Sequence, residues 1–407
     1  MEKKDYYNSV TDQVLDLKNL ASLQIRICFD LDVLKNMLPE ETAKGIRRVI
    51  ITGCGDSYSA AGAIMPGFKK LSGLHACNSP DIMDFCCFYT DKKILKSFQP
   101  DEVLLIGISF SGASVRVIDA LTKANSMGIH SLLITRTPDS KGAETAEIVM
   151  DVATPDGCNT PGLRSYYASL VGLAALGGYI GVCNGSISLE DFYSVATDIK
   201  DLTMKFMDHF DEIDDLMFSE ALRMKNLRKF ELLADWNEGY SAQFIEQKVI
   251  ECSGAFCYHT TSEEFAHIGF MARCPEEIGE IVIINEDDKS LGRMKDSING
   301  CLAQHRPTLI VTDIEKENFD LSVNDFAGDS PYFKQIAGHN TMAERGTPVF
   351  CKIPKAKELW MSSFIDFLPG SLFAGYHAAV NELPFFGGRY NFRTQIWNMN
   401  EGGAQHV

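Results

Sequence analysis

Short apolar runs alternate with helix-length segments along most of this chain. Strands that are apolar throughout are buried on both faces, which happens when helices cover both sides of a parallel sheet. In the first half, the pattern predicts strands at 47–53, 102–109, 131–136 and 147–152 and helices at 57–72, 112–127 and 163–183. This alternation predicts an α/β domain built on a parallel sheet.

The second half repeats the same rhythm. It predicts strands at 229–235, 255–260, 280–285, 308–313 and 348–353 and helices at 239–252, 290–304 and 361–382. The polar segment between the halves, rich in Asp, Lys and Met, predicts linking helices. We therefore expect an α/β fold with two three-layer α/β/α domains of one kind, each with a parallel sheet, as a duplication would produce.

The expected boundaries follow from these changes of pattern. They are an N-terminal helical segment at 1–44, a first domain at 45–185, a helical linker at 186–227, a second domain at 228–382 and a tail at 383–407. The tail carries too much Gly and Asn for regular structure. Its aromatic residues indicate that it packs against the chain, where it could close over a site.

Composition limits the class of partner. The 407 residues include 38 basic and 55 acidic side chains, a formal net charge of −17, which argues against nucleic acid or an anionic membrane as partner. A small anionic ligand stays possible, because it senses only its own pocket. No apolar signal region opens the chain, and no apolar run approaches the roughly 18–20 residues of a membrane span.

Cysteine usage indicates the compartment. The 12 cysteines form no C-x-x-C pair and no cluster with His at zinc spacing. Scattered cysteines of this kind are typical of a reducing compartment. We expect a cytoplasmic protein with no metal site and no cofactor.

Two predicted strand ends combine glycine with serine where a helix begins. One is Gly53-Cys54-Gly55-Asp56-Ser57, and the other is "SFSGAS", residues 109–114. Glycine lets a ligand approach the backbone, and a helix N-terminus offers unpaired N–H groups and partial positive charge. Together with serine hydroxyls, these groups form a phosphate site that needs no lysine.

Other interpretations of these loops exist. The first loop lacks the third glycine of a dinucleotide fingerprint, and no loop has the Gly-Lys-Ser/Thr of a P-loop. Either loop alone could be helix capping, since Ser and Asp are favoured caps. Two such loops on successive strands favour a ligand site.

The sequence "GCGDSYSAA", followed about 50 residues later by "SFSGAS", resembles the sugar isomerase (SIS) domain family. That family binds the phosphate of a phosphosugar with a G-x-G-x-S loop and an S-x-S-G-x-T/S loop. The resemblance implies that the phosphate site consists of Gly55, Ser57, Ser109, Ser111 and Ser114. Ser114 stands where Thr is more usual, and Phe110 stands where Gln is common, so one side-chain contact is lost there.

Residues 244–270 resemble the second SIS domain of glucosamine-6-phosphate synthases. There a helix carries Lys-x-x-Glu, and sixteen residues after the Glu comes the His of a Glu-x-x-His turn. Lys248, Glu251, Glu264 and His267 have that spacing. Moving a carbonyl between C1 and C2 of a sugar needs a base, which the resemblance assigns to Glu251. It assigns ring opening to His267, and Lys248 could stabilise the enolate-like charge or lower the pKa of the base.

This chain also departs from the synthases. The usual Lys-His-Gly-Pro reads Ala266-His267-Ile268-Gly269, and the Schiff-base lysine of the tail has no match. Its place falls near Thr394, beside Arg393, and Arg389 is a further cation of the tail. No N-terminal cysteine nucleophile or glutaminase domain is present, so glutamine is not expected to be the nitrogen donor.

The resemblance implies a stand-alone double-SIS enzyme acting on a 6-phosphorylated, amino-substituted sugar as an isomerase, a deaminase or a deglycase. In the synthases the histidine reaches the neighbouring subunit, so we expect a homodimer with active sites at its interface. The alternative is a non-catalytic phosphosugar sensor. Sensors usually carry a helix-turn-helix domain, for which the first 45 residues are too short. A dinucleotide-dependent oxidoreductase is disfavoured by the missing third glycine.

Overall fold

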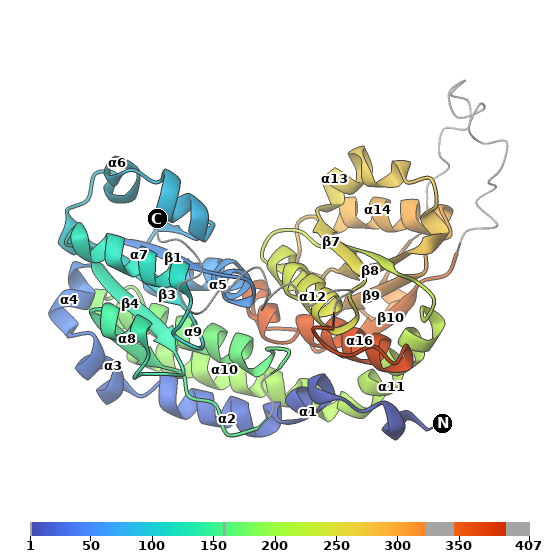
Figure 1. The fold of residues 1–407 in the computed structure, drawn as a ribbon, viewed down its shortest axis with the longest axis horizontal. Coiled ribbons are helices and arrows are strands. Elements are labelled where there is room, and N and C mark those ends of the chain that lie inside the picture. Colours follow the sequence, from blue (N-terminus) through green and yellow to red (C-terminus); the bar gives the residue numbers. More distant parts are fainter. Residues whose placement is uncertain (1, 158–159, 322–345, 388–407) are drawn as a thin grey trace. The chain divides into compact units, whose positions relative to one another are not determined.

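Two separate parallel sheets organise the chain. The structure, a computed structural model, describes residues 2–157, 160–321 and 346–387. These residues form two compact units, a first unit at 9–207 and a second unit at 2–8 and 208–387. Each unit is built on one five-stranded sheet (Figure 1).

The first unit begins with four short helices and then alternates strands with helices. Its strands are β1 Arg48–Gly53, β2 Ala76–Asn78, β3 Val103–Ile108, β4 His130–Thr135 and β5 Ile148–Asp151. Its helices are α1 Ser9–Leu15, α2 Leu17–Cys28, α3 Leu31–Met37, α4 Glu40–Gly45, α5 Asp56–Ser72, α6 Asp91–Leu95, α7 Val115–Ser126, α8 Lys141–Thr145, α9 Arg164–Asn184 and α10 Leu189–Asp208. A π-helix, η2, covers Asp84–Phe88, and a 3-10 turn, η3, covers Pro100–Glu102.

The second unit repeats the alternation. Its strands are β6 Lys229–Leu233, β7 Phe256–Thr260, β8 Ile278–Ile283, β9 Thr308–Thr312 and β10 Val349–Lys352. Its helices are α11 Phe210–Arg223, α12 Glu238–Ser253, α13 Ser262–His267, α14 Leu291–Ala303 and α16 Phe367–Val380. Short 3-10 turns are η1 Lys3–Tyr6, η4 Gly269–Met271, η5 Pro275–Glu277, η6 Lys316–Asn318 and η8 Leu359–Phe364.

The two sheets have the same topology. The strand orders are β2-β1-β3-β4-β5 and β7-β6-β8-β9-β10, so in each unit the second strand lies at one edge beside the first. Every strand pair is parallel. The expected fold class, two α/β/α domains with parallel sheets, is confirmed, and the shared order supports a duplication.

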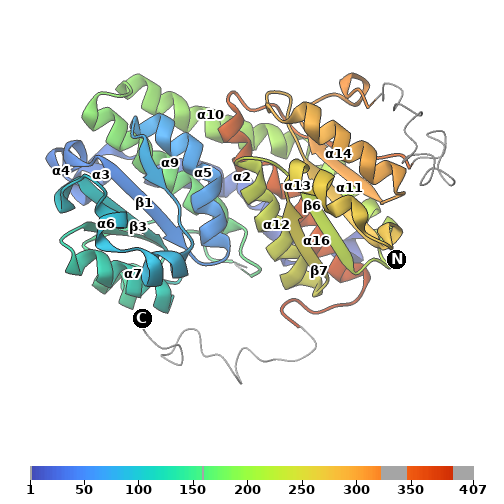
Figure 2. The same cartoon turned by 90° about the horizontal axis from the view of Figure 1, so that it is seen from above.

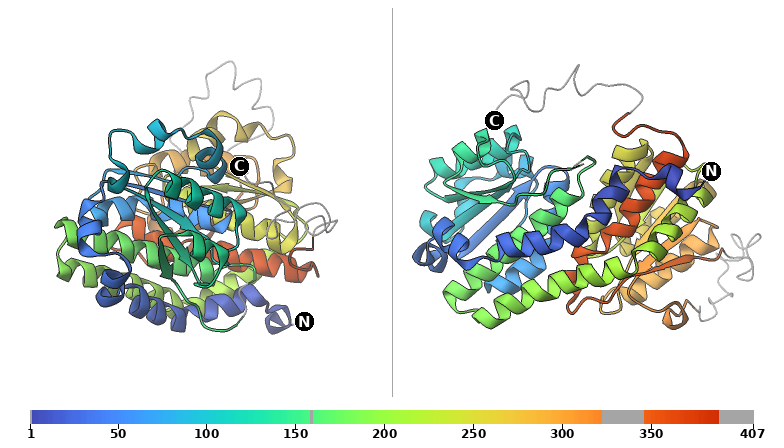
Figure 3. Two further views of the ribbon diagram at one scale, coloured as in Figure 1. Left: turned by 60° about the vertical axis from the view of Figure 1, so that its left-hand side comes forward. Right: turned by 90° about the horizontal axis from the view of Figure 1, so that it is seen from below.

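Helices cover both faces of the first sheet (Figures 1 and 3). On one face α5 packs against β1 and against the buried helix α9. On the other face, α7 packs its apolar side on Ile50, Leu105 and Leu133, one residue from each of three neighbouring strands. Burial on both faces explains why these strands are mostly apolar.

Helices also cover both faces of the second sheet, and the strand alternation assigns each helix to a face (Figure 2). Phe230 of β6 points toward α16, where its ring lies 5.4 Å from that of Phe373. Leu233, three residues later, belongs to the core that contains Phe265 of α13 and residues of α14. Because α12 packs on α16, α12 and α16 cover one face, and α13 and α14 cover the other.

Helix α9 corrects one expectation about membrane spans. It is long and apolar enough to cross a membrane by length and composition, the one such helix among the described residues. Its apolar window is 89% buried within the structure, chiefly against α5, α2 and α4. A core helix meets the same criteria, so α9 gives only weak support for a membrane span.

The structure differs from the predicted elements in a few places. The sequence analysis did not predict strand β2, because three residues are too few to show a strand-like hydrophobic pattern. The helix expected at 361–382 is instead the 3-10 turn η8 followed by α16, and the hydroxyl of Ser362 bonds Asp366 Oδ2 at 3.1 Å at the break. The units divide between residues 207 and 208, inside the expected linker, and residues 2–8 group with the second unit.

A buried charge cluster lies within the second sheet. Glu231 of β6 and Glu280 of β8 are directly paired in register, and both side chains are buried. Arg306 Nη1 donates to a carboxylate oxygen of each, at 2.8 Å for Glu280 Oε2. Tyr258 Oη donates to Glu231 Oε1 at 2.5 Å. Burial and the neighbouring Glu231 raise the pKa of Glu280 to about 8.

Because of this cluster, we expect the folded protein to become less stable as pH rises toward 8. Between the usual glutamate pKa and about 8, folded Glu280 keeps a proton that the unfolded chain has lost, so the free energy of unfolding falls as pH rises. We expect Glu280→Gln to remove this contribution, so that its stability relative to wild type increases from pH 5 to 8 by up to about 1.4 kcal/mol per pH unit. Urea unfolding of both proteins at several pH values measures this difference, and parallel pH curves would contradict it.

Candidate functional site

The two serine loops meet at the carboxyl edge of the first sheet. Strands β1 and β3 are neighbours, and the chain leaves them toward opposite sides of the sheet, which is the switch point where open α/β sheets bind ligands. Gly53 and Ile108 are paired in register, so both loops begin at the same level. The Sγ of Cys54 lies 3.5 Å from the Oγ of Ser114. The structure therefore brings together the two loops that the sequence singled out.

Glycines in these loops are required by space and backbone angle. A Cβ on Gly53 would lie 2.6 Å from the Cβ of Ser57. Gly55 has φ of +55°, which disfavours other residues. Gly112 has φ of +64°, and a Cβ there would lie 1.8 Å from Ser140 Oγ. Larger residues at these three positions would clash with neighbouring atoms or strain the backbone.

Hydrogen-bond donors gather at this edge. Helices α5 and α7 both begin there, and the side chain of Ser114, the N-cap of α7, makes no capping bond. Ser109 is almost fully buried, and no partner is found among the described residues for its hydroxyl or for that of Ser57. Ser111 Oγ accepts from the Ala113 N–H at 3.3 Å. Free hydroxyls and first-turn N–H groups are suited to a phosphate.

Charged groups that sequence reasoning missed surround the loops. Arg116 lies in the first turn of α7, paired with Asp119 at 2.8 Å. Arg136 follows β4, and its guanidinium lies 5.6 Å from the ring centroid of Phe110. Asp81 faces Cys54; burial, chiefly, and this carboxylate raise the pKa of the Cys54 thiol. The spacing of Arg116 two residues after Ser114 is a signal that could have found it.

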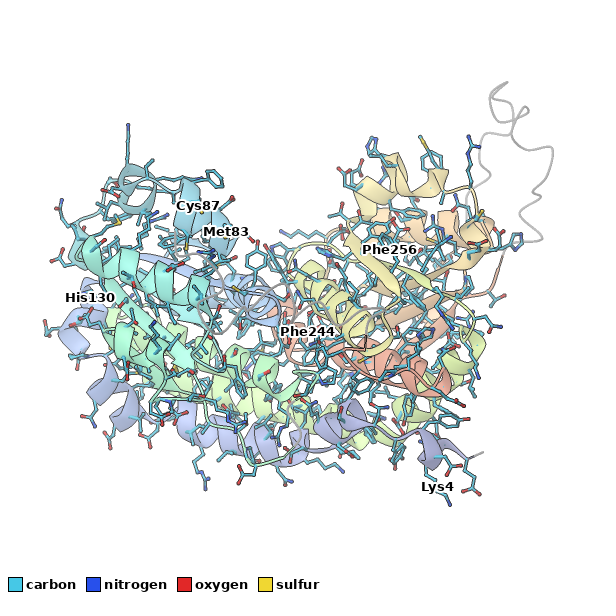
Figure 4. The ribbon with its side chains drawn as sticks, viewed as in Figure 1. Lys4, Met83, Cys87, His130, Phe244 and Phe256 are labelled. Atoms are coloured by element: carbon cyan, nitrogen blue, oxygen red, sulfur yellow. The ribbon has the colours of Figure 1, made fainter. Side chains whose placement is uncertain are left out.

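The second candidate group lies on α12. Lys248 belongs to the buried stripe of this helix, and its Nζ lies 2.5 Å from Glu251 Oε2. The ammonium also lies 4.8 Å from the ring centroid of Phe244 (Figure 4). The side chain of Glu251 is 30% exposed. A buried cation is costly unless it is paired, so Lys248 holds the Glu251 carboxylate in one place while leaving part of it accessible.

The start of the tail passes the same helix end. The backbone N–H of Phe386 donates to the Glu251 carbonyl oxygen at 2.7 Å. The tail segment at 383–387 therefore packs beside the candidate base. Arg389 and Arg393, the proposed tail cations, lie outside the described residues, as does Thr394.

His267 is the last residue of α13, and its side chain is 65% exposed. Its Nε2 lies 2.9 Å from Oε1 of Glu263, whose Oε2 accepts from Arg293 Nε at 2.7 Å. The partner is Glu263, four residues before the histidine on α13, rather than Glu264 of the expected Glu-x-x-His turn. The hydrogen bond from Arg293, and then that from His267, lowers the pKa of Glu263.

Within one chain, His267 does not join Glu251. Glu251 belongs to α12 on one face of the second sheet, and His267 belongs to α13 on the other face. Lys248 and Glu251 are brought together; the histidine is not. The arrangement leaves an exposed histidine directed away from its own base.

The carboxyl edge of the second sheet differs from that of the first. Where the first sheet has serine loops, Glu238 is fully buried and accepts from Asn285 Nδ2 at 2.5 Å. The Asp235 carboxylate accepts from the Ser262 N–H at 3.0 Å and hydroxyl at 2.6 Å. Burial, with neighbouring carboxylates, raises the pKa of Glu238 well above its usual value. Among the residues that the structure describes, carboxyl groups therefore occupy this edge where the first sheet has serine hydroxyls.

No group of three or more His, Cys, Asp or Glu side chains that could hold a metal ion occurs within the described ranges. The prediction of a metal-free, cofactor-free protein stays a prediction.

Comparison with known proteins decides the family of the first unit. Residues 44–177, which run from the end of α4 into α9 and hold both serine loops, match the family model described as the SIS domain. The first unit therefore contains a SIS domain. The resemblance drawn from the two loop motifs is confirmed.

Sequence relatives and solved structures match a larger share of the chain than the family model does. The chain is 24% identical over 303 residues to the glutamine–fructose-6-phosphate aminotransferase [isomerizing] of Streptococcus agalactiae, covering 72% of this chain and 46% of that relative. The chain thus spans about half the length of the curated relatives it matches.

Solved structures confirm a fold of two SIS-type domains. The C-terminal domain of glucosamine-fructose-6-phosphate aminotransferase from Francisella tularensis gives a TM-score of 0.72 at 16% identity, covering 94% of this chain and 98% of that one. Glucosamine-6-phosphate deaminase from Thermotoga maritima gives 0.60 at 15% identity, covering 93% and 97%. At these identities the likeness shows the fold.

Cys54 offers a direct probe of the SIS loops. Because only the thiolate is alkylated and the pKa of Cys54 is raised, we expect iodoacetamide to label it slowly at neutral pH and faster as pH rises. We expect fructose 6-phosphate at ten times its dissociation constant to slow the labelling about tenfold, because the ligand occupies the loop. Mass spectrometry measures the rate, with exposed Cys274 of the second unit as control. Equal labelling with and without ligand would argue against phosphate binding here.

Proposed function

We propose that this chain binds a 6-phosphorylated sugar through its two serine loops and moves a proton between C1 and C2 of that sugar with Glu251. The observation that carries the proposal is the meeting of both loops and two helix N-termini at the switch point of the first sheet. The relatives' printed names, aminotransferase [isomerizing] and deaminase, are consistent with this chemistry.

The phosphate would be held mainly by neutral donors. Ser57, Ser109, Ser111 and Ser114 supply hydroxyl groups, and the first turns of α5 and α7 supply N–H groups. The chain's formal net charge of −17 disfavours anions in general, so a local donor set is needed. Arg116, although paired with Asp119, adds positive charge at the start of α7.

The proton transfer follows from the Lys248–Glu251 pair. The carboxylate of Glu251 would take the proton from C2 of an aldose, leaving an enediol, and return it to C1, so that the ketose forms and the base is regenerated. The hydroxyl proton moves from O2 to O1 in the same exchange. Lys248, held 2.5 Å from Glu251, would stabilise the negative charge that develops on the enediol oxygens.

Ring opening would fall to His267 of a second copy of the chain. His267 lies on the face of its own second sheet opposite Glu251. Ile268, Phe270 and Met271, which follow it in the chain, are exposed, and so are Tyr258 and Phe256 (labelled in Figure 4) of the edge strand β7. An exposed apolar patch of this kind marks an interaction site. A homodimer that covers the patch would deliver the histidine to the partner's base; the dimer and a cytoplasmic location stay predictions.

The substrate's C2 group separates three reactions. With oxygen at C2 the proton transfer is an aldose–ketose isomerisation. With nitrogen at C2 the ketose form is an imine that water hydrolyses, which makes the enzyme a deaminase. With an amine on C1 of the ketose, the reverse transfer gives an imine at C1, which water hydrolyses to the aldose and the free amine, and this makes the enzyme a deglycase. We favour an amino-substituted substrate.

The second candidate is a phosphosugar sensor that binds without turnover. It is favoured by the segment Ala266–Gly269, which lacks the residues that flank the histidine in the synthases. In a sensor the serine loops would keep their role and Glu251 would have none.

Proton NMR in deuterated water distinguishes the two functions. We expect loss of a C1 or C2 proton signal from one of glucosamine 6-phosphate, fructose 6-phosphate or a fructosamine 6-phosphate incubated with the protein. Glu251→Gln removes the base, so exchange should fall about 100-fold or more. Glu246→Gln, on the same helix but bonded to His259, is the matched control and should retain exchange.

Each outcome of that experiment is informative. Exchange that persists in Glu251→Gln would remove the proposed base. Clear binding without exchange of any of the three sugars would favour the sensor.

Mixed dimers test the origin of the histidine. We expect dimers purified through two different tags, one subunit Glu251→Gln and the other His267→Ala, to have about half the wild-type activity, because one of their two sites keeps both residues. Dimers of either single variant should have little activity. If the histidine acted on its own chain's base, neither site of the mixed dimer would be intact, and it would be as inactive as the single variants.

A further inference from the structure

The short segment that carries His267 is tied to the sheet at points on both sides of the histidine. Before it, Phe265 is buried, and the guanidinium of Arg306 lies 5.0 Å from its ring centroid. After it, the carbonyl oxygen of Gly269 accepts from Arg306 Nη2 at 2.7 Å. One buried side chain therefore contacts both flanks of an exposed histidine.

Arg306 is itself held rigidly. Its Nη1 bonds the paired carboxylates of Glu231 and Glu280, and its Nε donates to Gln304 Oε1 at 3.0 Å. Gln304 Nε2 in turn donates to the carbonyl oxygen of Phe270. A guanidinium offers five N–H donors in a fixed planar fork, so bonding two carboxyl groups through Nη1 and Gln304 through Nε directs an N–H of Nη2 at Gly269.

The segment has no room to shift at Gly269. A Cβ there would lie 2.7 Å from Phe265 Cδ2 and 3.0 Å from Glu231 Oε1. The six-residue helix α13 is too short to be stable by itself. Its position therefore depends on these tertiary contacts, and Arg306 is the residue common to them.

We infer that Arg306 is a positioning residue for His267: its buried guanidinium, anchored on Glu231 and Glu280, fixes the place from which the histidine reaches a sugar. This inference rests on the proposed ring-opening role of His267. Arg306 pairs with the buried glutamates through Nη1, and its Nη2 holds the Gly269 carbonyl oxygen beside the exposed histidine.

Arg306→Lys tests the inference because it keeps a positive charge for the two carboxylates but loses the fork and the ring contact. We expect hydrogen exchange of amides in 262–271 to become faster while the rest of the second unit keeps its protection. We also expect turnover of cyclic fructose 6-phosphate to fall about tenfold, because a displaced catalytic group loses rate.

An open-chain substrate separates positioning from general damage. The 5-deoxy analogue of fructose 6-phosphate cannot close a furanose ring and needs no ring opening. Its turnover should stay within about twofold of wild type in Arg306→Lys, since Glu251 lies on the other face of the sheet. Arg48→Lys, another buried arginine, bonded to the Ile94 carbonyl oxygen in the first unit, is the matched control and should change neither substrate.

A milder variant guards against loss of folding. Gln304→Ala removes the bond to the Phe270 carbonyl oxygen and the acceptor for Arg306 Nε without emptying the core. It should show the same selective loss on the cyclic substrate, to a smaller extent.

The inference is overturned if exchange in 262–271 is unchanged in Arg306→Lys, or if both substrates slow equally. It is supported if only the cyclic substrate slows and only this segment loosens. If His267→Ala turns over the cyclic substrate at the wild-type rate, the proposed ring-opening role fails instead, and hydrogen exchange alone then decides whether Arg306 anchors the segment.

Discussion

The parallel pairing of β1 with β3 is the constraint on which the candidate site depends. Because Gly53 and Ile108 are in register, two loops that lie about 50 residues apart in sequence end at one level, and two helices begin there. Both strands are buried along their whole length, mostly by apolar side chains, which fixes the register. The proposed phosphate site thus depends on core packing that lies outside the loops.

The second sheet shows how a duplicated topology can be put to a different use. Its strand order is the same, yet the edge that carries serine loops in the first sheet is filled by Asp235, Glu238 and their hydrogen-bond partners. The residues proposed for proton transfer and ring opening lie instead on the helices α12 and α13, on opposite faces of the sheet.

Two buried ion pairs or clusters lie next to the candidate residues of the second unit. Lys248 is buried against Glu251, and Arg306 is buried against Glu231 and Glu280. A buried charge needs partners in fixed geometry, so each cluster is also a positioning device. One sets the place of the base, and we infer that the other sets the place of the histidine.

The sequence by itself determined the two α/β domains, because apolar strands and helix-length segments alternate visibly along the chain. It also determined the serine loops, because glycine, serine and the start of a helix are adjacent in the chain. Spacing also placed Lys248 and Glu251 on one helix face. Only the tertiary structure decided that Arg136 lies beside Phe110 of the second loop, and that His267 and Glu251 lie on opposite faces of the second sheet. These facts depend on which strands pair and which helices cover each face, and such long-range contacts leave no local pattern in the chain.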